Sequence, residues 1–156
     1  MIRYATAVAA LFSLGALAQP RPEFEVVSTK RVEGAESVYR RASFANDETG
    51  LVIILKRTSA AGSIVVYGND YVLAWESEKS IPRSPCMGIS YAMKSPDEET
   101  RWSSIGGISR YWYNAGEQYF ALLFAVPKDV HTFSLNRAAP FAHVSARPLA
   151  QVPAAP

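Results

Sequence analysis

The chain is poor in the residues that build most small catalytic and metal sites. It has 156 residues but one cysteine and two histidines, and its 16 Lys and Arg nearly balance its 14 Asp and Glu. One cysteine cannot close a disulfide within the chain, and His131 and His143 do not form a zinc-binding pattern. The basic residues are scattered rather than gathered in a block, which does not favour nucleic-acid binding. The sequence therefore predicts no metal, no other cofactor and no nucleic-acid partner.

Long hydrophobic runs are confined to the start of the chain. Arg3 precedes an uncharged, mostly apolar stretch from Tyr4 to Leu17, and Ala16-Leu17-Ala18 places small residues where a signal peptidase cleaves. The stretch is shorter than the about 20 residues that span a bilayer. The sequence thus predicts a cleaved signal peptide at residues 1–18. We expect an exported protein, periplasmic or extracellular, with no membrane span after cleavage.

Helical periodicity is nearly absent after the signal. Short segments rich in Val, Ile, Tyr, Phe and Trp recur instead between clusters of Gly, Pro, Asn and Asp, a pattern typical of β-strands and turns. We predict strands at Phe24–Val32, Ser37–Phe44, Leu51–Arg57, Ser63–Tyr67, Tyr71–Glu76, Gly88–Met93, Ser109–Tyr113, Tyr119–Val126, Thr132–Asn136 and Ala142–Arg147. Strands without helices favour an all-β sandwich of two antiparallel sheets over residues 19–147. Residues 148–156, with three prolines, are predicted to be a disordered Pro/Ala tail.

Two local patterns make this prediction more specific. Gly68-Asn69-Asp70 separates two apolar runs, and because Gly and Asn tolerate positive φ it predicts a β-hairpin between Ile64–Tyr67 and Tyr71–Trp75. Leu51–Leu55 and Tyr119–Val126 are apolar at both odd and even positions. Because successive side chains of a strand point to opposite faces, these two strands should be covered on both faces. They are predicted to lie at the centre of a sheet.

Four short motifs resemble elements of telokin-like immunoglobulin-fold domains on exported bacterial proteins. Tyr71-Val72-Leu73 resembles an aromatic-x-Leu strand, and Asn114-Ala115-Gly116-Glu117 resembles an x-Pro-Gly-Glu turn with Ala in place of Pro. Phe124-Ala125-Val126-Pro127-Lys128-Asp129 resembles a Phe-x-Val-Pro-x-Asp element, and Phe133-Ser134-Leu135 the strand after it. The resemblance implies an immunoglobulin-like β-sandwich, usually without known catalytic residues, on a periplasmic or surface protein.

No catalytic template is complete in this sequence. Gly107-Ile108-Ser109-Arg110-Tyr111 has Tyr where the nucleophile elbow G-x-S-x-G needs its second Gly. Asp97-Glu98-Glu99 is a tight acidic cluster, but neighbours in one loop do not face each other across a cleft. We therefore expect a solvated loop, with a loose calcium loop as the alternative. Cys86 has no adjacent His to activate it; a half-buried apolar role is expected, with an intermolecular disulfide or a reactive thiol as alternatives. We expect no enzymatic activity.

Tryptophan, tyrosine and arginine side chains gather late in the chain, and these residue types dominate binding hot spots. The candidate binding residues are Arg101, Trp102, Arg110 and Trp112. Because side chains alternate along a strand, Trp112 cannot share a face with Tyr111 and Tyr113. We expect the site where the loops Ser77–Pro85 and Lys94–Gly107 meet the strand Ser109–Tyr113.

These features favour a non-catalytic module that binds a protein or a cell-envelope component. Two other classes stay open on the sequence alone. One is a small secreted hydrolase that uses the acidic cluster at 97–99. The other is a carbohydrate-binding module with Trp102 and Trp112 on one flat exposed face. The basic pairs Lys30-Arg31, Arg40-Arg41 and Lys56-Arg57 are interpreted as strand ends or as protection of sheet edges.

Overall fold

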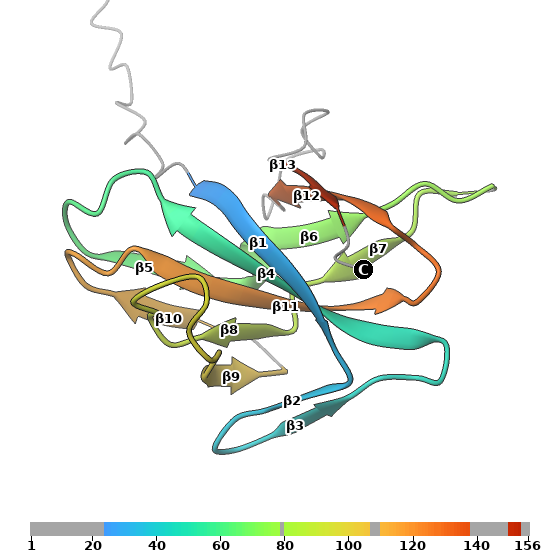
Figure 1. Cartoon of the computed structure of the whole chain (residues 1–156), viewed down its shortest axis with the longest axis horizontal. Coiled ribbons are helices and arrows are strands. Elements are labelled where there is room, and N and C mark those ends of the chain that lie inside the picture. The colour runs from blue at the N-terminus through green and yellow to red at the C-terminus, as the bar shows by residue number, and fades with distance from the viewer. Residues whose placement is uncertain (1–23, 79, 107–109, 138–149, 154–156) are drawn as a thin grey trace, which may run out of the picture.

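The computed structural model describes residues 24–78, 80–106, 110–137 and 150–153, so the predicted signal peptide, the strand Ala142–Arg147 and His143 lie outside it. Figure 1 shows mostly strands, and among the described residues the one helical element is the 3-10 turn η1 (Gly68–Asp70). The strands are β1 (Phe24–Val32), β2 (Gly34–Glu36), β3 (Arg41–Ser43), β4 (Glu48–Arg57), β5 (Ile64–Tyr67), β6 (Tyr71–Ala74), β7 (Arg83–Pro85), β8 (Gly88–Ser90), β9 (Trp102–Ile105), β10 (Arg110–Tyr113), β11 (Tyr119–Pro127), β12 (Thr132–Arg137) and β13 (Ala150–Pro153). The all-β prediction is confirmed.

A five-stranded antiparallel sheet in the order β1-β4-β11-β8-β9 forms one layer of the fold. β4 and β11, which contain the apolar runs Leu51–Leu55 and Tyr119–Val126, lie inside this sheet, as predicted. Leu51, Ile53 and Leu55 face one side of it and belong to the main core, whereas Val52 and Ile54 face the other side and belong to a second core. Their buried runs therefore reflect a sheet that is covered on both faces.

The second layer consists of a four-stranded sheet, β13-β12-β6-β7, and a two-stranded ribbon, β10-β5. Its inward side chains include Leu73, Tyr113, Phe133 and Val152, which pack in the main core with the inner face of the five-stranded sheet. Two apolar sheet faces thus bury each other, the arrangement of a β-sandwich.

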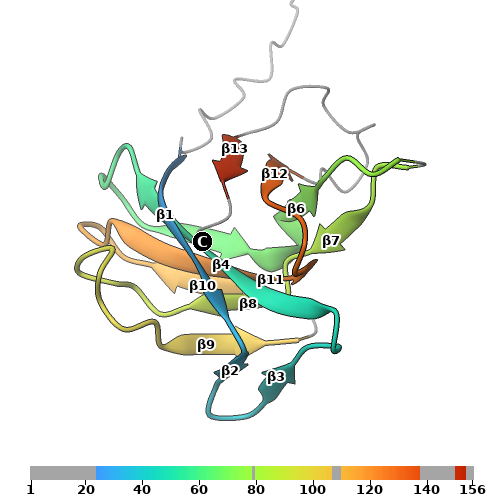
Figure 2. The ribbon, with the colours of Figure 1, turned by 45° about the vertical axis from the view of Figure 1, so that its right-hand side comes forward.

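The outer face of the five-stranded sheet is covered by the β2–β3 hairpin. Ala35 and Ala42 of this hairpin pack with Val52, Ile54 and other residues in the second core. Figures 1 and 2 both show the hairpin below the sheet, at the lowest part of the molecule. The predicted strand Ser37–Phe44 is shorter than expected, because Ser37 to Arg40 form the hairpin's turn.

The predicted hairpin between β5 and β6 is wrong. β5 pairs with β10, whereas β6 pairs with β12 and β7. A tight hairpin turn needs positive φ, and among the described residues only Gly62, Gly106 and Gly116 have it. Gly68 instead begins η1, which carries the chain from one sheet of the second layer to the other.

Three strands lie where the sequence predicted loops or a disordered tail. β7 and β9 fall within the predicted loops Ser77–Pro85 and Lys94–Gly107, and β13 falls within the tail predicted at 148–156. β13 pairs with β12, and its Val152 is fully buried opposite Phe133. Ladder bonds to β12, the buried Val152 side chain and a hydrogen bond from the Thr29 hydroxyl to the Pro153 carbonyl at 2.9 Å hold this strand, and its proline is tolerated at the sheet edge.

Cys86 is more buried than predicted. Its side chain is 5% exposed in the main core, and its thiol donates to the Gly88 carbonyl at 3.2 Å. Burial raises the pKa of the Cys86 thiol to about 12, so the unreactive protonated form dominates at neutral pH. This environment agrees with an apolar structural role for the cysteine.

Candidate functional site

The β5–β10 ribbon presents an aromatic surface to solvent. In its register Arg110 is opposite Tyr67, and Trp112 is opposite Val65. The Trp112 side chain is 60% exposed and Tyr67 is 40% exposed, while Arg110 is exposed and Val65 half-buried. We call these four residues the outer ribbon face. Trp, Tyr and Arg are enriched in binding hot spots, so this face is the candidate binding surface.

The opposite face of the ribbon is fixed in the core. Tyr113 is fully buried, and its hydroxyl donates to the Ser90 carbonyl of β8 at 2.8 Å. Its ring lies 4.9 Å from that of Phe120 and 4.7 Å from that of Tyr111 between centroids. Burial raises the pKa of Tyr113, so the phenol stays neutral and keeps donating. Because neighbouring side chains alternate, this anchoring of Tyr113 directs Trp112 outward.

A buried arginine holds one end of the ribbon, where β5 begins and β10 ends. Arg57, at the end of β4, is 2% exposed and faces the main core side of its sheet. Its guanidinium donates to the carbonyl of Gly62, just before β5, at 2.9 Å. It also donates to the carbonyls of Asn114 and Glu117, in the turn after β10, at 3.1 and 3.0 Å. Arg57 is the last residue of β4, so its interpretation as a strand end is confirmed. It does not protect a sheet edge, because β4 lies inside its sheet and the charge is buried and bound by carbonyls.

A turn follows β10 at Asn114–Glu117, the segment that resembles an x-Pro-Gly-Glu turn. Gly116 has φ of +89°, the Glu117 amide donates to the Asn114 carbonyl, and the Asn114 amide donates to the Glu117 carboxylate at 2.6 Å. The Gly116 amide also donates to the Ala60 carbonyl at 3.0 Å. This turn leads from the ribbon to the five-stranded sheet, so it joins layers rather than paired strands.

The structure separates the four candidate residues into three environments. Arg110 and Trp112 share the outer ribbon face. Trp102 is 7% exposed in the second core, so it cannot offer contact area; the prediction that placed it at a binding surface is wrong because the β2–β3 hairpin covers that face of the sheet. Arg101 is exposed and lies on the Tyr111 side of β10.

A shallow hollow of about 390 Å³ lies beside Arg101, and Lys94, Glu117 and Tyr119 also line it. Tyr111 stands close by, packed edge-on against Tyr91 at 5.3 Å between ring centroids. Partial burial, Glu117 and Tyr91 raise the pKa of Tyr111, and Arg101 acts in the opposite direction. The charged side chains of the hollow are Lys94, Arg101 and Glu117. The Glu117 carboxylate already accepts a hydrogen bond from the Asn114 amide in the turn, and its charge balances one of the two cations.

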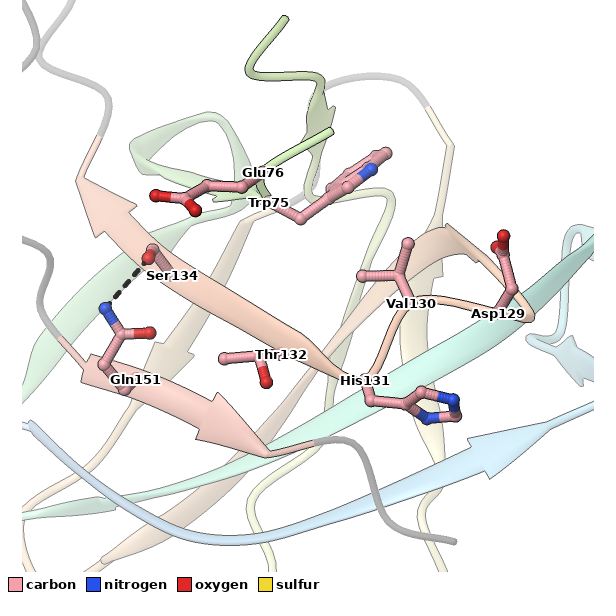
Figure 3. Close-up of a pocket in the computed structure, with 8 residues that line it drawn as sticks. All are labelled: Trp75, Glu76, Asp129, Val130, His131, Thr132, Ser134 and Gln151. Carbon is pink, nitrogen blue, oxygen red and sulfur yellow. Dashed lines mark hydrogen bonds between the residues drawn. The ribbon is translucent and has the colours of Figure 1, made fainter. Parts of the chain in front are cut away.

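A second hollow of about 480 Å³ lies over β12 and β13 (Figure 3). Ser134 and His131 line it, but Figure 3 shows the imidazole directed away from Ser134. The Ser134 hydroxyl accepts a hydrogen bond from the Gln151 amide at 3.1 Å. Nucleophilic catalysis needs a base within hydrogen-bond reach of the serine, and this arrangement does not supply it.

The acidic cluster is also structural in part. The Glu98 carboxylate accepts a hydrogen bond from the Lys94 amide at 2.6 Å, which closes the turn, while Asp97 and Glu99 are exposed. In the part of the chain that the structure describes, no three His, Cys, Asp or Glu side chains come together as metal ligands. Within the same ranges, no helix has the length and apolar character needed to cross a bilayer.

Comparisons with known proteins identified no relative of this chain. A scan against protein-family models, a search of curated proteins and a search of solved structures each found no match. The outer ribbon face and its supports are therefore the features of this chain that bear on function. The sequence indicated Trp112 and Arg110 but not Tyr67 and Val65, which pair with them in the ribbon. Because Val66 points into the core, the alternation along β5 directs Tyr67 and Val65 to the outer face.

Proposed function

We propose that this protein is an exported, non-catalytic immunoglobulin-like module that binds a protein or a cell-envelope component through the outer ribbon face. The observation that carries the proposal is the 60% exposure of Trp112 on a ribbon whose other face is locked into the core. A rigid indole gives a large contact area at small cost in side-chain entropy, and Arg110 adds directional donors for an acidic or carbonyl-rich partner.

Export and the immunoglobulin-like topology are the other parts of the proposal. The signal motif at residues 1–18 supports export, and the resemblance of four motifs to telokin-like domains supports the family of the sandwich. The two-layered antiparallel fold agrees with that resemblance at the level of fold class. In modules of this kind the sheets supply rigidity while exposed side chains make the contact.

Trp112→Ala should weaken binding without weakening the fold. Trp112 is mostly in solvent, so its truncation removes little buried area, and we expect the thermal midpoint to stay within a few degrees. Loss of a hot-spot tryptophan should lower partner affinity by about 2 kcal/mol or more, roughly thirtyfold. The measurement is quantitative recovery of envelope components by the mature chain, with the thermal midpoint recorded for each variant.

A matched control is available at Ile81. This side chain is 64% exposed, similar to Trp112, but lies in the connection between β6 and β7. Ile81→Ala should recover the same component as the unaltered chain, and Arg110→Ala should behave like Trp112→Ala. Equal recovery by the Trp112, Arg110 and Ile81 variants would exclude the outer ribbon face as the binding site.

A further inference from the structure

The turn of the β2–β3 hairpin exposes two adjacent apolar side chains. Val38 is 82% exposed and Tyr39 is 87% exposed, more than any other large hydrophobic side chain that the structure describes. Polar residues and glycine normally occupy such turn positions. At this exposure neither side chain packs in the core of the fold, so both are available to contact another surface.

The turn is ordered by its own hydrogen bonds. The Ser37 amide donates to the Arg40 carbonyl at 2.8 Å, and the Arg40 amide donates to the Ser37 hydroxyl at 3.1 Å. The strands on either side are held in the second core through Ala35 and Ala42. Val38 and Tyr39 are therefore fixed in the turn of a supported hairpin. Figure 2 shows the β2–β3 hairpin at the lower end of the molecule.

Basic side chains flank the apolar tip. Arg40 and Arg41 follow Tyr39 directly, and both are exposed. Glu36 is opposite Arg41 in the hairpin register, so the tip keeps a net positive charge through Arg40. Guanidinium groups bind phosphate in a bidentate manner, and Tyr is enriched where an apolar phase meets a hydrated one.

We propose that this tip docks on the surface of an anionic phospholipid bilayer. Val38 and the Tyr39 ring enter the interface between headgroups and acyl chains, and Arg40 and Arg41 contact lipid phosphates. A bilayer suits a convex tip because it deforms around two side chains, whereas a protein partner would have to supply a matching pocket. With two apolar groups and two arginines the binding is reversible, and it holds the module at the membrane without a spanning segment. The outer ribbon face is not needed for it.

The test is co-sedimentation of the mature chain with vesicles of phosphatidylcholine alone and of phosphatidylcholine with phosphatidylglycerol. We expect binding to the anionic vesicles and much less to the neutral ones. Val38→Asp and Tyr39→Asp should each lower the vesicle partition coefficient about tenfold, and Arg40→Gln about fivefold. Ile81→Asp, at a similarly exposed apolar position, should leave it unchanged. Trp112→Ala should also bind normally, which separates this inference from the proposed function.

Insertion is measured directly with Tyr39→Trp in a Trp112→Phe background. Brominated acyl chains should quench the tryptophan at position 39, while the parent Trp112→Phe protein should show little quenching, since Trp102 is buried and Trp75 half-buried. Absence of binding to anionic vesicles would overturn the inference. So would binding that the tip variants do not reduce, or a tryptophan at position 39 that brominated lipid does not quench.

Discussion

Trp102→Ala should lower the free energy of unfolding by about 3–5 kcal/mol, the range expected for truncating a buried aromatic side chain. Trp102 is 7% exposed and packs in the second core with Ala35, Ala42 and Leu123. Its removal leaves a cavity between the five-stranded sheet and the β2–β3 hairpin, so the hairpin loses its main support. The measurement is urea unfolding followed by far-ultraviolet circular dichroism, which does not depend on tryptophan emission.

Trp112→Ala is the matched control, because the same atoms are removed from a side chain that is 60% exposed. We expect this variant to unfold within about 1 kcal/mol of the unaltered protein. Similar losses for the two variants would contradict the assignment of one tryptophan to the core and the other to the surface. Trp102→Phe, which keeps part of the volume, should fall between the two.

Arg57→Met should cost about 3 kcal/mol of stability, although it keeps much of the aliphatic volume. The change removes the guanidinium donor from the carbonyls of Gly62 and Glu117, and one of two donors from the carbonyl of Asn114, which keeps the Glu117 amide. An unpaired acceptor that is shielded from water costs about 1–3 kcal/mol. Because these carbonyls flank β5 and β10, amide hydrogen exchange should rise in the ribbon more than in β1 and β4. Unfolding in urea and residue-resolved exchange measure the two effects.

Lys56→Met tests whether position rather than charge produces this effect. Lys56 precedes Arg57 in β4, is half-buried and lies over the Tyr119 ring at 6.0 Å from its centroid. Its loss should cost less than about 1 kcal/mol and leave exchange in the ribbon unchanged. If Arg57→Met and Lys56→Met behaved alike, the role of Arg57 as the support of the ribbon would be wrong.

The strands at the centre of the fold were the most predictable part. Leu51–Leu55 and Tyr119–Val126 are apolar at every position, and only a strand covered on both faces uses such a run. The short strands β7, β9 and β13 could not be found in this way. They carry serines and prolines, and each pairs with the strand that precedes it in the chain across a long connection, so no tight-turn signal marks the pair.

The prediction of a hairpin between β5 and β6 was wrong because Gly and Asn permit the positive φ of a tight hairpin turn but do not require it. Gly68 and Asn69 tolerate positive φ, yet in the structure they form a 3-10 turn between two sheets. The partner of β5 is β10, more than forty residues later, and the choice between them is a property of the whole sandwich. Sequence therefore identified both strands and misjudged how they are connected in space.

The candidate site could be predicted only where the alternation of side chains along a strand determines which of them face solvent. Along β10 the pattern requires Trp112 to face away from Tyr111 and Tyr113, which is what the structure has. Burial of Trp102 depends on a hairpin from another part of the chain, so no local signal marks it. No local signal marks the burial of Arg57 either. It is one of several basic residues in adjacent pairs, and the carbonyls that bind it come from residues 62, 114 and 117.

The central claim, that the outer ribbon face is where this module meets its partner, is tested most directly by photo-crosslinking in the cell that produces it. A benzophenone amino acid is placed at position 112 of the full chain, at position 67 on the same face, and at position 81 as the exposed control. We predict one crosslinked envelope component shared by positions 112 and 67, absent at 81 and lost when Arg110→Glu is added. Crosslinks of equal yield at all three positions, or at position 81 alone, would contradict the claim.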